Sequence, residues 1–230
     1  MTPAREFEGF GGGGDVAFFR ALAKNNKKEW FQKRKAEFET DWHRPMGALI
    51  TEIARKIDAA YPDCDLGEPK VFRIHRDVRF AKDKSPYKTN VSGVLPMASA
   101  KGDKGGCAAF YLQLGTESFC GAGCYGMSGE VLERYRAALI DPKRGPEILK
   151  IVKKLEKAGG NVSAMESLKN VPRGFDPEHP AAELLKRKGL VVGRDAVPLA
   201  KIGSRAFLDW CVAEAKTFAP LVRWLTFATA

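Results

Sequence analysis

Residues 108–125, AAFYLQLGTESFCGAGCY, contain the pattern that decides the fold class. Side chains in this stretch vary with a period of two, which is the period of a β-strand, and a turn with glycine separates two such segments. The same period begins near residue 70, and the small, polar stretch 96–106 is typical of a hairpin connection. Residues 70–125 therefore predict a sheet of consecutive antiparallel strands. The predicted strands are 71–80, 88–95, 108–114 and 118–125.

Helical periodicity precedes this sheet. In residues 15–62 the apolar side chains recur at helical spacing. Asp15 is expected to cap a first helix, Asn26 and Glu29 have the spacing of a capping box for a second, and Pro45 suits the first turn of a third. The sequence therefore predicts a helical region ahead of the sheet.

Helical periodicity also follows the sheet, in residues 128–230. Ser128, Pro146 and Ser204 each stand where a helix is expected to begin, and Pro220 is expected to interrupt the last helix. Helices, then consecutive strands, then helices predict an α+β fold. Its antiparallel sheet has about four or more strands and is flanked by N-terminal and C-terminal helices.

Length and composition limit the class of protein. A chain of 230 residues fits one large domain, and since no linker or repeat divides it, we predict a single domain over residues 1–230. Hydrophobic residues make up 44% of the chain and aromatic residues 10%, which excludes a disordered protein. Lys and Arg outnumber Asp and Glu by 38 to 28, and this formal charge of +10 favours anionic partners.

The sequence also indicates a cellular compartment. No apolar run approaches the ~20 residues of a membrane helix, and the N-terminus lacks the apolar region of a secretory signal. Five cysteines are an odd and sparse set, so a disulfide framework is not expected, and Cys120 and Cys124 are interpreted as buried reduced thiols. We therefore expect a cytoplasmic protein without membrane contact.

A glycine-rich stretch, residues 9–14, formally satisfies the G-x-G-x-x-G spacing of a dinucleotide-binding loop. No strand precedes it, and residues 33–35, Lys-Arg-Lys, stand where an acidic ribose partner is needed. We therefore expect no cofactor. Residues 1–14 are interpreted as a flexible lead-in that lets Phe7 and Phe10 pack back on the domain.

Half of the net charge lies in residues 70–88, KVFRIHRDVRFAKDKSPYK, called the basic segment below. Seven basic and two acidic residues give 7 − 2 = +5. Since side chains alternate between the faces of a strand, the even positions up to Phe80 would form an apolar face. The odd positions from Arg73 to Arg79 would form a polar, cationic face. Arg76, on the apolar face, requires either a bulge that turns it outward or a carboxylate partner.

This row of cations predicts an anion-binding site. Arginine binds an anion with two hydrogen bonds, lysine adds mobile charge, and Tyr87 could add a hydroxyl or a stacking surface. The alternative is a lattice of ion pairs that closes the sheet, in which carboxylates neutralise the arginines. The candidate ligand-binding residues are Arg73, Arg76, Arg79, Lys82, Asp83, Lys84, Tyr87, Lys88 and Arg173.

Several motifs resemble those of one known family. The most specific is FRIHRDVRFAKDKSPYKTN at residues 72–90, and others are F-x-G-F at 7–10 and PRGFD at 172–176. Together they extend over nearly the whole chain, which is similar to a family of uncharacterised bacterial and fungal proteins, domain of unknown function family 2461. The glycines at 11–14 and the sequence CYGM at 124–127 depart from the family pattern, outside the charged motif. The resemblance implies a shared fold and site, and no particular reaction.

A second loop, residues 171–180, has the sequence VPRGFDPEHP, and its three prolines stiffen it. We expect it to fold over the sheet near the basic segment and to present Arg173 and His179 there. The alternative, about equally supported, is that Asp176 and His179 only cap and close the loop.

The residues leave two functions open. The first is an anion-binding module, which holds a phosphate-bearing ligand or a nucleic-acid backbone with the basic segment. The alternative is an enzyme acting on a small phosphorylated or carboxylated substrate, with Asp77 and His179 as acid–base groups and arginines that hold the anion. Because the arginines beside Asp77 would repel a cation, we predict no metal site. The sequence alone decides neither whether a reaction is catalysed nor the oligomeric state.

Overall fold

The computed structural model describes residues 6–12, 15–99 and 107–230. Part of the predicted hairpin connection, residues 100–106, lies outside the described residues. So do residues 1–5 and 13–14 of the lead-in.

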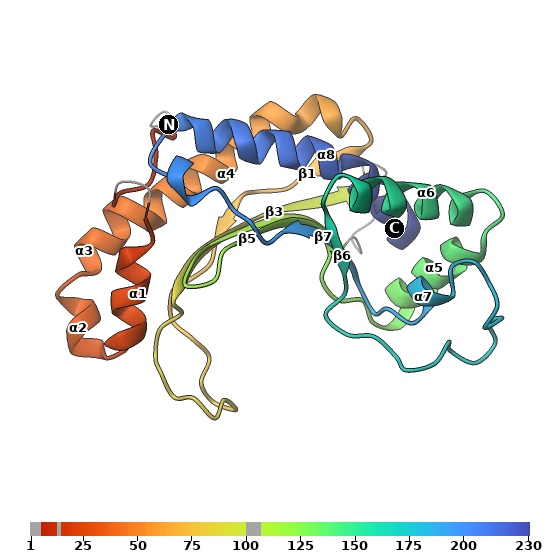
Figure 1. Cartoon of the computed structure of the whole chain (residues 1–230), viewed down its shortest axis with the longest axis horizontal. Helices are drawn as coiled ribbons and strands as arrows, with labels where there is room; N and C mark the ends of the chain where they lie inside the picture. The colour runs from red at the N-terminus through yellow and green to blue at the C-terminus, as the bar shows by residue number, and fades with distance from the viewer. Residues whose placement is uncertain (1–5, 13–14, 100–106) are drawn as a thin grey trace.

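A seven-stranded sheet forms the centre of the fold (Figure 1). All its strand pairs are antiparallel, the strand order is β1-β3-β4-β5-β7-β6, and β2 is a second partner of β3. The strands are β1 (Cys64–Leu66), β2 (Lys70–Val71), β3 (Asn90–Ser99), β4 (Ala108–Gly115), β5 (Phe119–Cys124), β6 (Asn161–Ser163) and β7 (Leu190–Arg194). The sheet and the helices before and after it confirm the predicted α+β fold.

Helices flank this sheet on the N-terminal and C-terminal sides of the chain. Before the sheet come α1 (Ala17–Lys24), α2 (Lys28–Gln32), α3 (Lys35–Phe38), the π-helical turn η1 (Glu39–His43), α4 (Arg44–Ile57) and the 3-10 turn η2 (Asp58–Ala60). After β5 come α5 (Gly129–Ile140), α6 (Arg144–Lys157), α7 (Ala182–Leu185), the 3-10 turn η3 (Leu199–Lys201) and α8 (Arg205–Thr229). Figure 1 shows α4 and α8 together on one face of the sheet, with α1–α3 beyond one end and α5–α7 beyond the other.

The core lies between the sheet and the helices α4 and α8. On β4 every second side chain is buried toward these helices, while the side chains between them are only partly covered. Gly93 of β3 allows α4 to approach closely, because a Cβ atom there would lie 2.8 Å from the Ile50 side chain. The fully buried side chains of this layer include Met46, Leu49, Ile50, Ile53, Phe110, Leu112 and Leu114.

Helix α8 continues through Pro220 without a break, so the predicted interruption is wrong. Proline in a helix interior removes one hydrogen bond and costs about 3 kcal/mol. Tertiary packing outweighs that cost, because α8 contacts β3, β4 and β5 as well as α4, α5 and α6. Although α8 has 25 residues, no helix in the described ranges is both long and apolar enough to cross a membrane.

The described part of the lead-in, residues 6–12, is held against the domain. Phe7 and Phe10 are buried, which confirms that they pack back on it. The Phe7 N–H donates to the Glu52 carboxylate in α4, and the Phe10 N–H donates to the Ile202 carbonyl at 2.8 Å. These bonds hold residues 6–12, called the N-terminal strap below, against α4 and the turn before α8.

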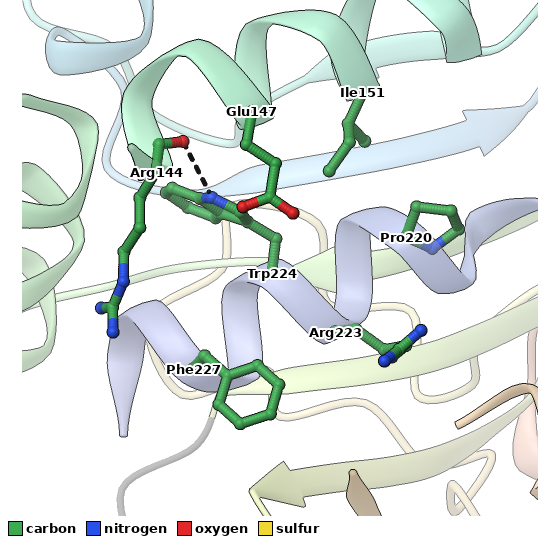
Figure 2. A pocket seen from close by; sticks show the side chains of 7 residues that line it. All are labelled: Arg144, Glu147, Ile151, Pro220, Arg223, Trp224 and Phe227. Atoms are coloured by element: carbon green, nitrogen blue, oxygen red, sulfur yellow. Dashed lines mark hydrogen bonds between the residues drawn. The ribbon is translucent and has the colours of Figure 1, made fainter. Parts of the chain in front are cut away.

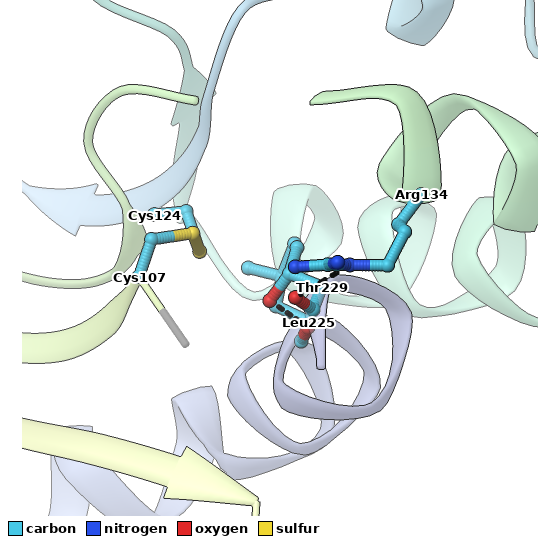
Figure 3. Close-up of a disulfide and its surroundings, with 5 residues drawn as sticks. All are labelled: Cys107, Cys124, Arg134, Leu225 and Thr229. Atoms are coloured by element: carbon cyan, nitrogen blue, oxygen red, sulfur yellow. Dashed lines mark hydrogen bonds between the residues drawn. A yellow bond between two sulfur atoms is a disulfide. The ribbon is translucent and has the colours of Figure 1, made fainter. Parts of the chain in front are cut away.

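Cys107 and Cys124 form a disulfide (Figure 3), so the interpretation of Cys124 as a reduced thiol is wrong. The register pairs Ala108 with Cys124 across β4 and β5, and this places Cys107 beside its partner. The interpretation of Cys120 as a buried thiol is confirmed. The free cysteines, all buried, are Cys64, Cys120 and Cys211.

Reduction of this disulfide is expected to lower the free energy of unfolding by about 3 kcal/mol, because the crosslink restricts the unfolded chain over a separation of 17 residues. Urea denaturation with and without reductant measures the loss. Thiol titration of the denatured protein should find three thiols before reduction and five after it. The variant Cys107→Ser/Cys124→Ser is the control, since its stability should not respond to reductant. Five reactive thiols without reductant would contradict the assignment.

Candidate functional site

The basic segment is a strand only over Lys70–Val71, so the prediction of a strand to Phe80 is wrong. The register pairs Val71 with Gly93, and β3 begins at Asn90, so a longer strand would have no partner beyond residue 74. The chain leaves the sheet there as an irregular loop, visible in Figure 1 below the sheet. Phe72 is 42% exposed and Phe80 is 94% exposed, so the expected apolar face does not form.

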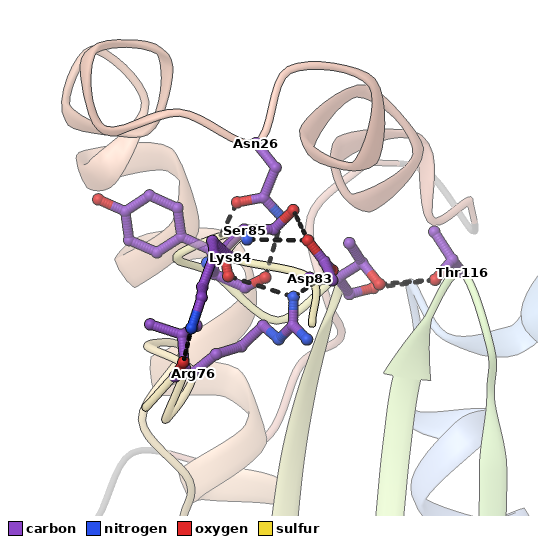
Figure 4. Close-up of polar contacts among 9 residues, drawn as sticks. Asn26, Arg76, Asp83, Lys84, Ser85 and Thr116 are labelled. Atoms are coloured by element: carbon purple, nitrogen blue, oxygen red, sulfur yellow. Dashed lines mark hydrogen bonds and ion pairs between the residues drawn. The ribbon is translucent and has the colours of Figure 1, made fainter. Parts of the chain in front are cut away.

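Contacts with the N-terminal helices anchor the basic segment (Figure 4). The Asn26 amide donates to the Tyr87 carbonyl at 2.9 Å and accepts from the Tyr87 N–H at 3.1 Å. The buried Tyr87 ring stacks on Phe31 with 4.3 Å between ring centroids. Tyr87 therefore holds the segment in place and has no ring face free for a ligand. Asn26 makes this contact instead of a capping box, since the N-cap of α2 is Lys27 and makes no side-chain bond.

Two arginines are neutralised within the segment. Half-buried Arg76 forms an ion pair with Asp83, whose carboxylate also accepts from the N–H and hydroxyl of Ser85 at 2.9 and 2.6 Å. The bonds from Ser85 and then Arg76 lower the pKa of Asp83 to about 2. Arg79 donates to both carboxylate oxygens of Asp77, which lowers the pKa of Asp77 and raises that of Arg79. The ion-pair alternative therefore describes these two arginines.

The other five basic residues of the segment (7 − 2 = 5) make no ion pair within the described part of the chain. Lys88 is half-buried, and its ammonium lies 5.2 Å above the centre of the Phe72 ring. Burial and then the neighbouring Arg73 lower the pKa of Lys88. The Lys88 N–H donates to the Ile74 carbonyl at 2.7 Å, so Lys88 lies across the loop from the residue that follows Arg73. Arg73 and Lys88 are called the cation pair below. The five residues are Lys70, Arg73, Lys82, Lys84 and Lys88.

The sheet face opposite α4 and α8 carries a cavity of about 640 Å³ that the sequence analysis did not predict. Figure 1 shows no helix of the described residues layered over this face, called the open face below. The strands contribute the partly covered residues of their alternating pattern, such as Tyr111 and Gln113 of β4. Phe72, at the base of the basic segment, lines the same cavity and lies under Lys88.

Aromatic rings from three elements line this cavity side by side. The Phe72 and Tyr111 ring centroids are 6.2 Å apart, and those of Tyr111 and Phe119 are 6.4 Å apart. Both pairs are tilted rather than stacked. Tyr125, which follows β5, is 68% exposed at the same cavity. The sequence signal for this row was the set of alternate positions in β4 and β5 that face away from the core. These positions hold Tyr111, Phe119 and glycine.

The loop 171–180 lies beside α7, at the opposite end of the molecule from the basic segment (Figure 1). It therefore does not fold over the basic segment as expected. Arg173 is exposed in this loop. The structure does not bring together Asp77 and His179, the acid–base groups of the enzyme hypothesis.

Local bonds in that loop fit the loop-closing alternative instead. The Asp176 carboxylate accepts from the Glu178 N–H at 2.9 Å. The His179 imidazole accepts from the Ala181 N–H at 3.1 Å. Each side chain therefore accepts from the backbone N–H two residues later in the chain, and together these bonds close the turn before α7.

A smaller cavity of about 290 Å³ lies between α6 and α8 (Figure 2). Arg144, Glu147 and Arg223 line it, and the Trp224 indole donates to the Arg144 carbonyl at 3.1 Å. None of the predicted site residues reaches it. Within the ranges that the structure describes, no three His, Cys, Asp or Glu side chains gather as metal ligands.

Comparison with known proteins places these features in one family. Residues 15–224 match the sequence profile of a family described as "Conserved hypothetical protein (DUF2461)". The matched range includes the basic segment, all seven strands and most of α8. A search of curated proteins finds no match.

Proposed function

This chain belongs to the DUF2461 family of conserved hypothetical proteins, and from its geometry we propose that it is an anion-binding module for a phosphate-bearing ligand. The observation that carries the proposal is the cation pair. Lys88 lies over Phe72 at the edge of the open face and bonds to the residue that follows Arg73, and neither cation has an ion-pair partner in the described ranges. Burial and the charge of Arg73 both lower the pKa of Lys88. A bound anion would relieve this repulsion.

A phosphate group suits this position in charge and geometry. The Arg73 guanidinium is exposed and can donate two parallel hydrogen bonds to phosphate oxygens, while the Lys88 ammonium adds a point charge. Lys82 and Lys84 extend the positive field along the loop, and the net charge of +10 would steer anions toward the protein. The ion pairs of Arg76 and Arg79 keep the loop in shape, so these two arginines support the site rather than form it.

Titration of the ¹⁵N-labelled protein with tripolyphosphate, a phosphate anion without rings, tests the proposal. Amide resonances near residues 73 and 88 should shift at low salt. Arg73→Ala/Lys88→Ala should weaken binding roughly tenfold or more, because charge-assisted hydrogen bonds are lost. The control, Lys153→Ala/Lys154→Ala, removes the same charge from exposed positions on α6 and should leave binding nearly unchanged. Equal weakening by both variants, or no shift in the basic segment, would refute the proposal.

A further inference from the structure

We infer that the phosphate-bearing ligand is a single-stranded nucleic acid whose bases stack on the open face. The inference rests on the proposed function for the phosphate contact and adds the part of the ligand that carries the rings. Three features support this inference: the residues that line the cavity, the floor of the cavity and its rim.

The cavity is lined by rings and by uncharged polar groups. None of the described residues that line it carries a formal charge. Its polar side chains are hydroxyls and one amide, including Tyr111, whose hydroxyl donates to Gln113 at 2.8 Å. A phosphate would have no cation inside this cavity, so the charged part of the ligand belongs at the rim and a neutral part belongs inside. Nucleobases are neutral, planar and edged with hydrogen-bonding groups, which matches this lining.

The floor of the cavity holds aromatic rings in place for the ligand. A Cβ atom at Gly193 would lie 2.3 Å from the Phe119 ring, and one at Gly121 would lie 2.7 Å from it. The outer end of the Phe119 ring therefore lies directly over these two glycines, where a larger side chain would displace it. The rings of Phe72, Tyr111 and Phe119 are tilted and their centroids are more than 6 Å apart, so the rings do not stack on one another. Such a row is a platform for successive unstacked bases.

At the rim of the cavity, cationic side chains that can bind the phosphates of a nucleic acid lie beside the first ring, Phe72. Lys88 lies above the Phe72 ring, and Arg73 directly follows Phe72 in the sequence. A strand with one base on Phe72 would therefore have its phosphates within reach of the cation pair, and further bases would extend over Tyr111 and Phe119. In a duplex the base faces are already stacked inside the helix, so this arrangement selects single strands. The rings and polar edges also fit bases better than a lipid chain, which has neither planar faces nor hydrogen-bonding groups.

Fluorescence polarisation with four probes at several salt concentrations tests the inference. The probes are a labelled single-stranded RNA and a single-stranded DNA of about 12 nucleotides, which is within the range of known single-strand site sizes, a DNA duplex, and an abasic deoxyribose-phosphate strand of the same length. The two single strands should bind at least tenfold more tightly than the abasic strand and the duplex. Log affinity should fall with log salt, by about 0.7 per phosphate contacted in a single strand. Arg73→Ala/Lys88→Ala removes two such contacts, so the slope should become shallower by about 1.4.

Variants of the rings separate stacking from charge. Phe72→Ala and Tyr111→Ala should each weaken single-strand binding about tenfold to a hundredfold and leave the abasic strand's affinity unchanged. Tyr111→Phe should recover most of the loss caused by Tyr111→Ala, because it keeps the ring. Phe72 is exposed, so Phe72→Ala keeps the test valid if Tyr111→Ala does not fold. Lys153→Ala/Lys154→Ala again controls for net charge.

Each outcome distinguishes this inference from the proposed function. If abasic and base-bearing strands bind equally and the ring variants have no effect, the inference fails while the phosphate site stands. If duplex binds as well as single strands, the inference also fails. If anionic phospholipid vesicles bind at the cation pair and no oligonucleotide does, the ligand is a lipid headgroup and the inference is wrong. If neither tripolyphosphate nor any strand binds, both proposals fail.

Discussion

Phe31→Ala is expected to lower the free energy of unfolding by about 4 kcal/mol and to release the basic segment from the N-terminal helices. Phe31 is 2% exposed, stacks on Tyr87 at 4.3 Å and packs against Phe38 at 5.6 Å. Removing a buried phenyl ring leaves a cavity and costs about 3 to 5 kcal/mol. Because Tyr87 loses its ring partner, its attachment to the N-terminal helices would depend on the bonds to Asn26.

Urea denaturation measures the stability loss, and hydrogen exchange of the amides in residues 72–89 measures the release. Exchange in this segment should accelerate more than exchange in β4. The matched control is Phe80→Ala, which removes the same ring from a position that is 94% exposed on the same loop. It should change stability by no more than about 0.5 kcal/mol. Unchanged exchange of residues 72–89 in Phe31→Ala would show that Phe31 does not anchor the segment.

Glu52→Ala is expected to lower the free energy of unfolding by about 3 kcal/mol. The buried Glu52 carboxylate in α4 accepts from the Phe7 N–H of the N-terminal strap and from Arg205 at 3.0 Å, at the start of α8. Truncation leaves the buried Phe7 N–H without an acceptor and removes a charge-assisted bond. Arg205 is partly exposed and can turn to water, so the loss should stay below that of a fully buried ion pair. Urea denaturation at neutral pH measures it.

The same group predicts a pH dependence. Burial opposes the charge on Glu52, but the Phe7 N–H and Arg205 outweigh it, so the pKa of Glu52 is lowered. A carboxylate with a lowered folded pKa stabilises the protein fully above its unfolded pKa of about 4.3. The contribution is lost as the pH falls through the folded value. Glu52→Gln keeps an acceptor and has no charge to titrate, so its stability deficit should shrink below about pH 4. A deficit that is constant with pH would contradict the assignment.

The fold class followed from patterns that depend only on near neighbours in the sequence. The alternation in 108–125 was sufficient for β4 and β5, and in β4 every second side chain is buried toward the helical layer. The same alternation in 71–80 was misleading, because the partner strand β3 begins opposite residue 74. Periodicity records which residues alternate, and not whether a neighbouring strand exists to pair with them.

The site depended on contacts between distant residues. The charge of the basic segment was visible in the sequence. The ion pairs that neutralise Arg76 and Arg79 follow from the path of the loop, and so does the lack of one at Lys88 among the described residues. The disulfide of Cys107 and Cys124 required the register of β4 and β5. The aromatic row required the placement of Phe72 beside β4 and β5, which single-sequence periodicity does not supply.

Helix α8 covers the sheet from the last part of the described chain, and this has a consequence for synthesis on the ribosome. The strands β3, β4 and β5 end at Cys124, and their apolar face is buried largely by residues 205–229. At the usual 5 to 20 residues per second, roughly 5 to 20 seconds separate the translation of Cys124 from that of Thr229. During that interval the nascent strands lack α8, so their apolar face is exposed and prone to aggregation.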